Sequence, residues 1–184
     1  MTTRDLVLTA LFAALIVALG LMPPVPVAGL PVPVTLQSLG IMLAGLILGP
    51  VRGGLAAALV VLLVVLGLPV LSGGRGGFGV VVGPTGGFLL GWVPGAVVTG
   101  WIVRRWAPGP WRRREAALAL LAGLAGGIGA VYAVGIPWLA AVTGMGLSRA
   151  LLGSAVFVPG DLIKAVAAVL VARGVRRAYP IEMR

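Results

Sequence analysis

Long apolar runs follow one another along the chain, and short segments rich in proline, glycine or arginine separate them. We read six runs, at about residues 6–22, 36–48, 55–68, 88–103, 116–134 and, in the last third, 148–173. The 184 residues are 60% hydrophobic and only 10% charged, whereas a typical soluble domain carries about 25% charged residues. The mean hydropathy is +1.15. The sequence therefore predicts a single all-α domain, residues 1–184, embedded in the lipid bilayer as six transmembrane helices.

Pro159 divides the last apolar run. Because the residue before a proline avoids helical geometry, we favour a short helix over about 148–157, a break at Val158 and a final helix that begins at Pro159. One long kinked helix over 149–173 is the alternative. In the favoured arrangement Asp161 lies in the first turn of the final helix, where the helix dipole favours an anion.

Arginines are distributed unevenly between the two sides of the predicted six-helix topology. Both termini and the second and fourth loops share one side, which holds Arg4, Arg52, Arg104, Arg105, Arg112, Arg113, Arg114, Arg173, Arg176, Arg177 and Arg184. The other side holds Arg75 and Arg149. The positive-inside rule places both termini in the cytoplasm. It also accounts for the net charge of +10 without a nucleic-acid partner, because no basic face with interleaved aromatics is present. We expect no cleavable signal peptide.

Cysteine and histidine are both absent from the sequence. Their absence excludes disulfides, thiol nucleophiles, Cys/His zinc sites and histidine-dependent triads. No nucleophile–base set is visible, so an enzyme is not expected, and neither a metal nor a cofactor is expected in this chain. The sequence has no Walker motif, and any energy from ATP must therefore come from another subunit.

The stretch "VFVPGDLIKAVAAVLVA" places Asp161 and Lys164 inside an apolar run. At a spacing of three residues they share one helix face. They are read as the only charge pair in the interior, since the other acids flank apolar runs. Ionisable groups within a membrane usually mark a functional cavity. A structural ion pair, or a lysine that snorkels to the interface, is the alternative.

Further candidates fall on the outer side. In "GPTGG", the backbone at Gly83 and Gly86 and the Thr85 hydroxyl could contact a ligand, or Thr85 could only cap the fourth helix. Arg75 is either a solvated loop charge or a ligand contact, and Trp138 is either an interfacial residue or a pocket wall. Donors and acceptors of this kind suit a small ligand.

Two other segments carry local predictions. "PVPVTLQ" is too rich in proline for a helix and could form a stiff lid, with Thr35 as a cap for the second helix. On the first helix, Ala10, Ala14 and Ala18 lie along one edge, which could form a groove for a helix of a partner or could pack internally.

"PVPVTLQ", "GPTGG", "WL" and "PGDLIKA", in this order, resemble the BioY family. These proteins are the biotin-specific substrate-binding S components of energy-coupling factor (ECF) transporters, and the resemblance covers most of the chain. It implies a six-helix protein of a prokaryotic cytoplasmic membrane that binds biotin from outside. It also implies docking on a transmembrane coupling subunit that carries two ATPase subunits, although some members are thought to act without this module.

The resemblance also implies roles for individual residues. The family's Asp and Lys of the last helix fall on Asp161 and Lys164, and its docking motif falls on Ala10 and Ala14. Gln37, in the "PVTLQ" motif, joins the expected biotin-binding residues. Phe88 stands where members often carry tyrosine. An S component for another small vitamin, or a structural membrane protein in which the Asp–Lys pair only fixes packing, are the alternatives.

Overall fold

The computed structural model describes residues 1–108 and 111–179, which lie in helices and connecting segments without a regular β-strand. Arg184 and Glu182 lie outside the described residues. The elements are α1 (Thr3–Leu19), α2 (Gln37–Leu48), α3 (Pro50–Val65), α4 (Phe78–Val82), α5 (Gly86–Trp106), α6 (Arg113–Leu124), the π-helix η1 (Ala125–Ala130), α7 (Val131–Thr143), α8 (Leu147–Ser154), the 3₁₀ turn η2 (Ala155–Phe157) and α9 (Val158–Ala178).

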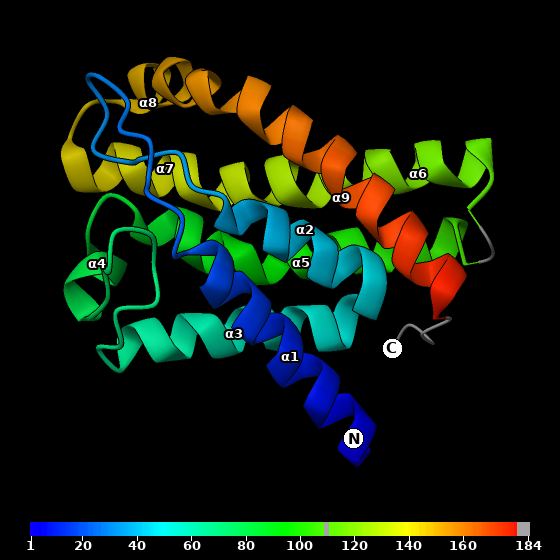
Figure 1. Cartoon of the computed structure of the whole chain (residues 1–184). Helices are drawn as coiled ribbons and strands as arrows, with labels where there is room; N and C mark the ends of the chain where they lie inside the picture. The colour runs from blue at the N-terminus through cyan, green and yellow to red at the C-terminus, as the bar shows by residue number, and fades with distance from the viewer. Residues whose placement is uncertain (109–110, 180–184) are drawn as a thin grey trace.

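Helix α5 lies in the middle of the bundle, in contact with α2, α3 and α7, while α9 packs on α2 and α6 (Figure 1). Small residues allow these helices to approach closely. A Cβ atom added at Gly100 would lie 2.4 Å from the Gly49 carbonyl carbon, and one at Gly91 would lie 2.8 Å from the Val131 carbonyl oxygen. Helix α1 runs obliquely across the bundle, and its N-terminal end projects beyond α3 in this view.

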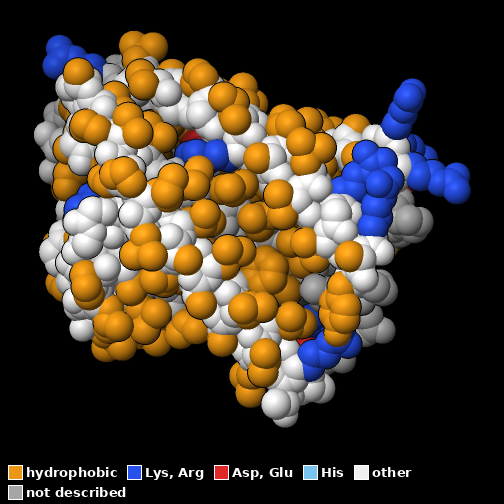
Figure 2. Space-filling model, viewed as in Figure 1, with side chains coloured by type: hydrophobic (Ala, Val, Ile, Leu, Met, Phe, Trp, Pro, Cys, Tyr) orange, Lys and Arg blue, Asp and Glu red, His pale blue; other side chains and the backbone are white. Residues whose placement is uncertain are grey.

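Within the described residues, three continuous helical stretches are long and apolar enough to cross a membrane: Gly86–Trp106, Arg113–Thr143 and Leu147–Ala178. Helices α2 and α3 are also apolar but shorter. Apolar side chains cover much of the surface in Figure 2, and most Lys and Arg side chains gather toward the end where α6 begins and α9 ends. This distribution is that of an all-helical membrane protein.

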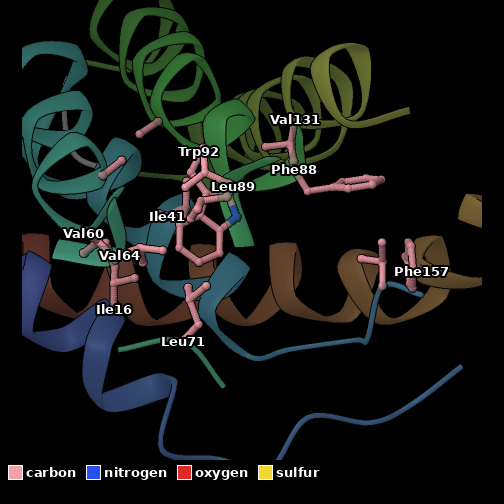
Figure 3. Close-up of a cluster of buried hydrophobic side chains, with 14 of the residues drawn as sticks. Ile16, Ile41, Val60, Val64, Leu71, Phe88, Leu89, Trp92, Val131 and Phe157 are labelled. Carbon is pink, nitrogen blue, oxygen red and sulfur yellow. The ribbon is translucent and has the colours of Figure 1, made fainter. Parts of the chain in front are cut away.

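Many apolar side chains that fill the bundle belong to one buried cluster drawn from α1, α2, α3, α5, α7 and η2. In the view of Figure 3, Ile16, Val60 and Val64 lie at one end of this cluster and Phe157 at the other. Trp92 and Leu89 of α5 lie between these ends. Leu89 and Trp92 also line the pocket described below.

The fifth apolar run forms a longer helix than the sequence predicted. Helix continues without interruption from Arg113 through η1 to Thr143, so the predicted end at about residue 134 is wrong. Pro137, beyond the predicted end, lies inside α7. In an apolar environment, backbone N–H and C=O groups released by ending a helix find no water to bind. Losing the one hydrogen bond that proline cannot donate is therefore less costly than ending the helix.

The break predicted before Pro159 is also wrong. Val158 is helical, with φ −55° and ψ −48°, and only the 3₁₀ turn η2 separates α8 from α9. The alternative of one long helix is closer to the structure. Asp161 does lie in the first turn of the last helix, as predicted. Pro94 lies inside α5, which continues through it.

Of the two predicted helix caps, the one at Thr35 is wrong and the one at Thr85 is correct in position only. Leu36, not Thr35, is the N-cap residue of α2, and Thr85 occupies the N-cap position of α5 without a capping hydrogen bond from its side chain. A capping box that the sequence analysis missed begins α1: Asp5 N–H donates to Thr2 Oγ1, and Thr2 N–H donates to Asp5 Oδ2. Helix α4, in the glycine-rich loop, was not predicted either.

Candidate ligand-binding pocket

A pocket opens between the loop before α2, the loop after α3 and helices α5, α7 and α9. Five of the residues predicted to bind a ligand line it, namely Asp161, Lys164, Arg75, Thr85 and Gln37. The other lining residues are Val32, Pro33, Val34, Thr35, Ser38, Leu71, Phe88, Leu89, Trp92, Gly127, Val131, Tyr132 and Phe157. The sequence therefore identified most of the polar residues of the pocket, but not Thr35, Ser38 or Tyr132.

Lys164 connects three segments of the pocket. Its Nζ donates to the Thr35 carbonyl oxygen at 2.7 Å, to Ser38 Oγ at 3.0 Å and to Asp161 Oδ1 at 2.9 Å. An ammonium group has three N–H donors, so all of them are used. Lys164 thus ties the proline-rich loop and α2 to α9, and it has no donor left for a ligand unless one of these contacts opens.

Asp161 accepts hydrogen bonds on both carboxylate oxygens. Oδ1 accepts from Lys164 at 2.9 Å and from Ser38 Oγ at 3.3 Å, while Oδ2 accepts from the Tyr132 hydroxyl at 2.7 Å. Each oxygen can accept about two hydrogen bonds. Oδ1 is therefore saturated, and Oδ2 retains capacity for one donor from a ligand. Asp161 is only 6% exposed and lies in the first turn of α9.

Ser38 and Tyr132 escaped the sequence analysis because their partner is remote. Tyr132 is 29 residues and Ser38 is 123 residues from Asp161. One signal was available for Tyr132, which is one of only two tyrosines and is the one that lies within an apolar run. Its hydroxyl supplies a polar group next to Phe88, the position where the resemblance suggests tyrosine.

An apolar aromatic wall faces this polar network. The Phe88 ring meets Tyr132 edge-to-face with centroids 5.9 Å apart, and meets Phe157 in the same way at 6.1 Å. Figure 3 shows Phe88 near Val131, while Leu89 and Trp92 extend the wall along α5. A ligand that fits has an apolar body and, at one end, a group that donates a hydrogen bond to a carboxylate.

Arg75 is a second cation in the pocket lining. Its Nε donates to the Ser72 carbonyl oxygen at 3.2 Å, and its backbone pairs with Leu71 in an isolated bridge. Burial lowers the pKa of Arg75 from its ordinary value. Arginine nevertheless stays protonated in proteins, so the pocket has a guanidinium that can pair with a carboxylate.

Gln37 lines the pocket, but its side-chain amide is already engaged. Nε2 donates to the carbonyl oxygens of Ile16 and Val70, and Oε1 accepts from Ser72 N–H at 3.1 Å. These bonds join the end of α1 and the loop after α3 to α2. Gln37 therefore holds the floor of the site in place.

The structure does not bring Gly83, Gly86 or Trp138 into the pocket lining. Trp138 Nε1 donates to the Gly83 carbonyl oxygen at 2.9 Å. A Cβ atom at Gly86 would lie only 1.6 Å from the Val81 carbonyl oxygen, so glycine is needed there for close packing. Within "GPTGG", it is Thr85 that reaches the pocket.

Two observations concern residues outside the pocket. Ala10, Ala14 and Ala18 are all exposed on α1, so the alternative that they pack internally is wrong.

Asp161 and Lys164 are not the only buried charge pair, because Asp5 and Arg52 form another, with Arg52 Nε 2.9 Å from Asp5 Oδ1. The sequence pattern assigned both residues to the flanks of apolar runs, whereas packing of α1 on α3 buries them.

Known proteins share this sequence and fold over nearly their full length. The model of the BioY family matches residues 1–181. "Biotin transporter BioY" of Rhizobium etli is 53% identical over 182 residues, which cover 98% of this chain and 97% of that protein. Its namesake from Rhodobacter capsulatus is 50% identical over 189 residues, covering 96% and 95%. A crystal structure of the S-component for biotin from an ECF-type ABC transporter superposes with a TM-score of 0.90 at 34% identity, and the match covers 96% of this chain and 95% of that one. The chain belongs to the BioY family.

Proposed function

We propose that this protein takes up biotin across the cytoplasmic membrane of a prokaryote, as the substrate-binding S component of an ECF-type transporter. The observation that carries the proposal is the buried network of Asp161, Lys164, Ser38 and Tyr132 at one edge of an aromatic-walled pocket. The names of the relatives and of the similar crystal structure support biotin as the ligand.

Biotin has hydrogen-bond donors and an apolar body that complement the groups lining this pocket. Its ureido ring carries two N–H donors, and one of them can complete the acceptor capacity of Asp161 Oδ2. The aromatic wall formed by Phe88, Trp92 and Phe157 accepts the thiophane ring and the valeryl chain. Arg75 provides a guanidinium for the ligand carboxylate. Lys164, whose donors are all occupied, acts mainly by holding Asp161 and the Thr35 loop in position.

The proposed topology has six spans: α1, α2, α3, α5, the continuous helix α6–α7 and the continuous helix α8–α9. Both termini are cytoplasmic, and the pocket is open toward the outer side. The distribution of arginines supports this orientation. The pocket then lies toward the outer side, because Thr35, Arg75 and Thr85 come from connections that this topology places outside.

Transport requires partners in this proposal. The chain has no Walker motif, so ATP hydrolysis belongs to two ATPase subunits that a transmembrane coupling subunit carries. The exposed edge of Ala10, Ala14 and Ala18 is the proposed docking surface, because small side chains allow another helix to approach closely.

Calorimetry of the purified protein with biotin tests the proposal, with riboflavin and thiamine as competing vitamins. We expect saturable binding of biotin alone. Biotin methyl ester should bind roughly 10- to 100-fold more weakly than biotin, the worth of a charged hydrogen bond. Arg75→Met should remove this difference, whereas Arg149→Met, which changes an exposed arginine, should preserve it. Absence of biotin binding would reject the function, and an unchanged ester penalty in Arg75→Met would reject only the role of Arg75.

A further inference from the structure

The N-terminal end of α1 is attached to the bundle through a buried ion pair. Arg52 Nε lies 2.9 Å from Asp5 Oδ1, and the two side chains are 5% and 4% exposed. Asp5 also accepts from the backbone of Thr2, so the same carboxylate joins the start of α1 to α3. Neither residue lines the ligand pocket.

Apolar packing contributes little at this end of the helix. The buried residues of α1 are Asp5, Thr9, Phe12, Ala13 and Ile16. The first two are polar, and the first buried apolar residue is Phe12. Leu8 packs partly against the core, while Leu6 and Val7 are exposed. The exposed Arg4 guanidinium also contacts Tyr179 at this end: its Nη2 lies 3.3 Å from the hydroxyl and its Cζ lies 5.5 Å from the ring centroid. Such surface contacts are weak.

A buried ion pair is a costly means of attachment. Well-packed apolar residues of similar volume usually stabilise a fold equally well or better, because they avoid the desolvation of two charges. What an ion pair adds is direction, since its strength depends on the relative placement of both groups. Asp5 and Arg52 each occupy the third residue of their helix, after Thr3 and Pro50 respectively. The pair therefore fixes where the start of α1 lies against the start of α3.

The alanine edge lies on the opposite face of α1. At 3.6 residues per turn, Ala14 is about 180° around the helix from Asp5, with Ala10 and Ala18 about 40° to either side. Any rotation of α1 that moves Asp5 away from Arg52 would turn this edge away by the same angle. The face that packs on α3 thus determines the direction in which the docking edge points.

We propose that Asp5 and Arg52 are positioning residues for transport: their ion pair sets the rotation and tilt of α1 so that the alanine edge meets a helix of the coupling subunit. The inference rests on the proposed docking of this edge. It assigns the pair no part in ligand binding.

The test removes or reverses the charges in the full transporter. Asp5→Asn/Arg52→Met replaces the pair by neutral residues of similar size, which a bundle usually tolerates. Asp5→Arg/Arg52→Asp reverses it. Because both residues sit at the same position of their helices, the interactions with the helix dipoles are exchanged, while the capping hydrogen bond from Thr2 N–H to the side chain of residue 5 is lost. Tyr179→Phe, which removes the exposed hydrogen bond from Arg4 at the same end but keeps the ring beneath its guanidinium, is the matched control.

Biotin affinity is measured in detergent, and uptake is measured in vesicles that contain the coupling and ATPase subunits. We expect the neutral variant to bind biotin within about twofold of wild type but to lose uptake by about tenfold or more, and the reversed pair to regain most of the uptake. Full uptake by the neutral variant, a parallel loss of affinity, or uptake by the reversed pair no higher than that of the neutral variant would overturn the inference. Failure of the wild-type protein to bind biotin would instead overturn the proposed function.

Discussion

Replacing Lys164 with methionine preserves most of the side-chain volume and removes three hydrogen bonds. The ammonium donates to the Thr35 carbonyl, to Ser38 and to Asp161, and the pair with Asp161 is almost fully buried. Removing one partner of a buried pair costs about 3–5 kcal/mol, because the remaining charge is uncompensated. Tyr132 and Ser38 still donate to Asp161, so we expect a loss near the lower limit, roughly 3 kcal/mol of the free energy of unfolding.

The double variant Asp161→Asn/Lys164→Met separates stability from binding. It has no uncompensated charge, so its free energy of unfolding should return to within about 1 kcal/mol of wild type. Biotin binding should not recover, because the acceptor for the ureido N–H groups is weakened. We expect the affinity to stay lower by about 2–4 kcal/mol, which corresponds to roughly 30- to 1,000-fold.

Unfolding in detergent and calorimetry with biotin provide the two measurements, and Arg149→Met, at an exposed cation, is the control that should change neither. A double variant as unstable as Lys164→Met alone would show that the bonds of Lys164 to Thr35 and Ser38, rather than charge pairing, hold the site. Wild-type affinity in the double variant would refute the assignment of the pocket.

Two further predictions concern packing and topology. Gly86→Ala should lower the free energy of unfolding by about 1–3 kcal/mol, because its Cβ would meet the Val81 backbone. Gly79→Ala, with open space around its Cβ, should be tolerated. Equal thermal stability of the two variants would contradict this packing argument. The chain has no cysteine, so Ser148→Cys and Arg113→Cys, both at exposed positions, should react with an impermeant thiol reagent from opposite sides of the membrane, and reaction of both from one side would exclude the six-span topology.

Local patterns predicted the charged part of the pocket. An aspartate and a lysine three residues apart, after a proline and inside an apolar run, indicate one helix face and the first turn of a helix. The structure confirms this placement for Asp161 and Lys164. The partners of the pair depend instead on which helices meet. Ser38 and Tyr132 come from α2 and α7. Nothing near Ser38 in the sequence distinguishes it from residues that only pack, and for Tyr132 the one local signal is its place within an apolar run.

The errors in the predicted helices have a common physical cause. The rule that a helix ends before a proline describes chains in which the unpaired backbone N–H and C=O groups can bind water. In the described helices Pro137 and Val158 are both helical, because an apolar setting makes a broken helix more costly than a distorted one. Asp5 and Arg52 were assigned to the flanks of apolar runs for a related reason. Hydropathy along the chain does not show that α1 and α3 cover each other at these ends.

Adjacent alanines on α1 provide a test of the docking surface with its own control. Ala14 is exposed, whereas Ala13 is 3% exposed and belongs to the buried cluster. The Ala14→Trp variant should fold normally, and its indole ring should block close approach of a second helix. Ala14→Trp should therefore bind biotin as wild type does, yet lose uptake in vesicles that contain the ATPase module.

Ala13→Trp overpacks the core and should lose stability, and with it both binding and uptake. The contrast between two neighbouring positions distinguishes an interface from general damage to α1. If Ala14→Trp transported biotin normally, the alanine edge would face only lipid. If it lost biotin affinity together with uptake, α1 would contribute to the pocket, and the separation between binding at α9 and docking at α1 would be wrong.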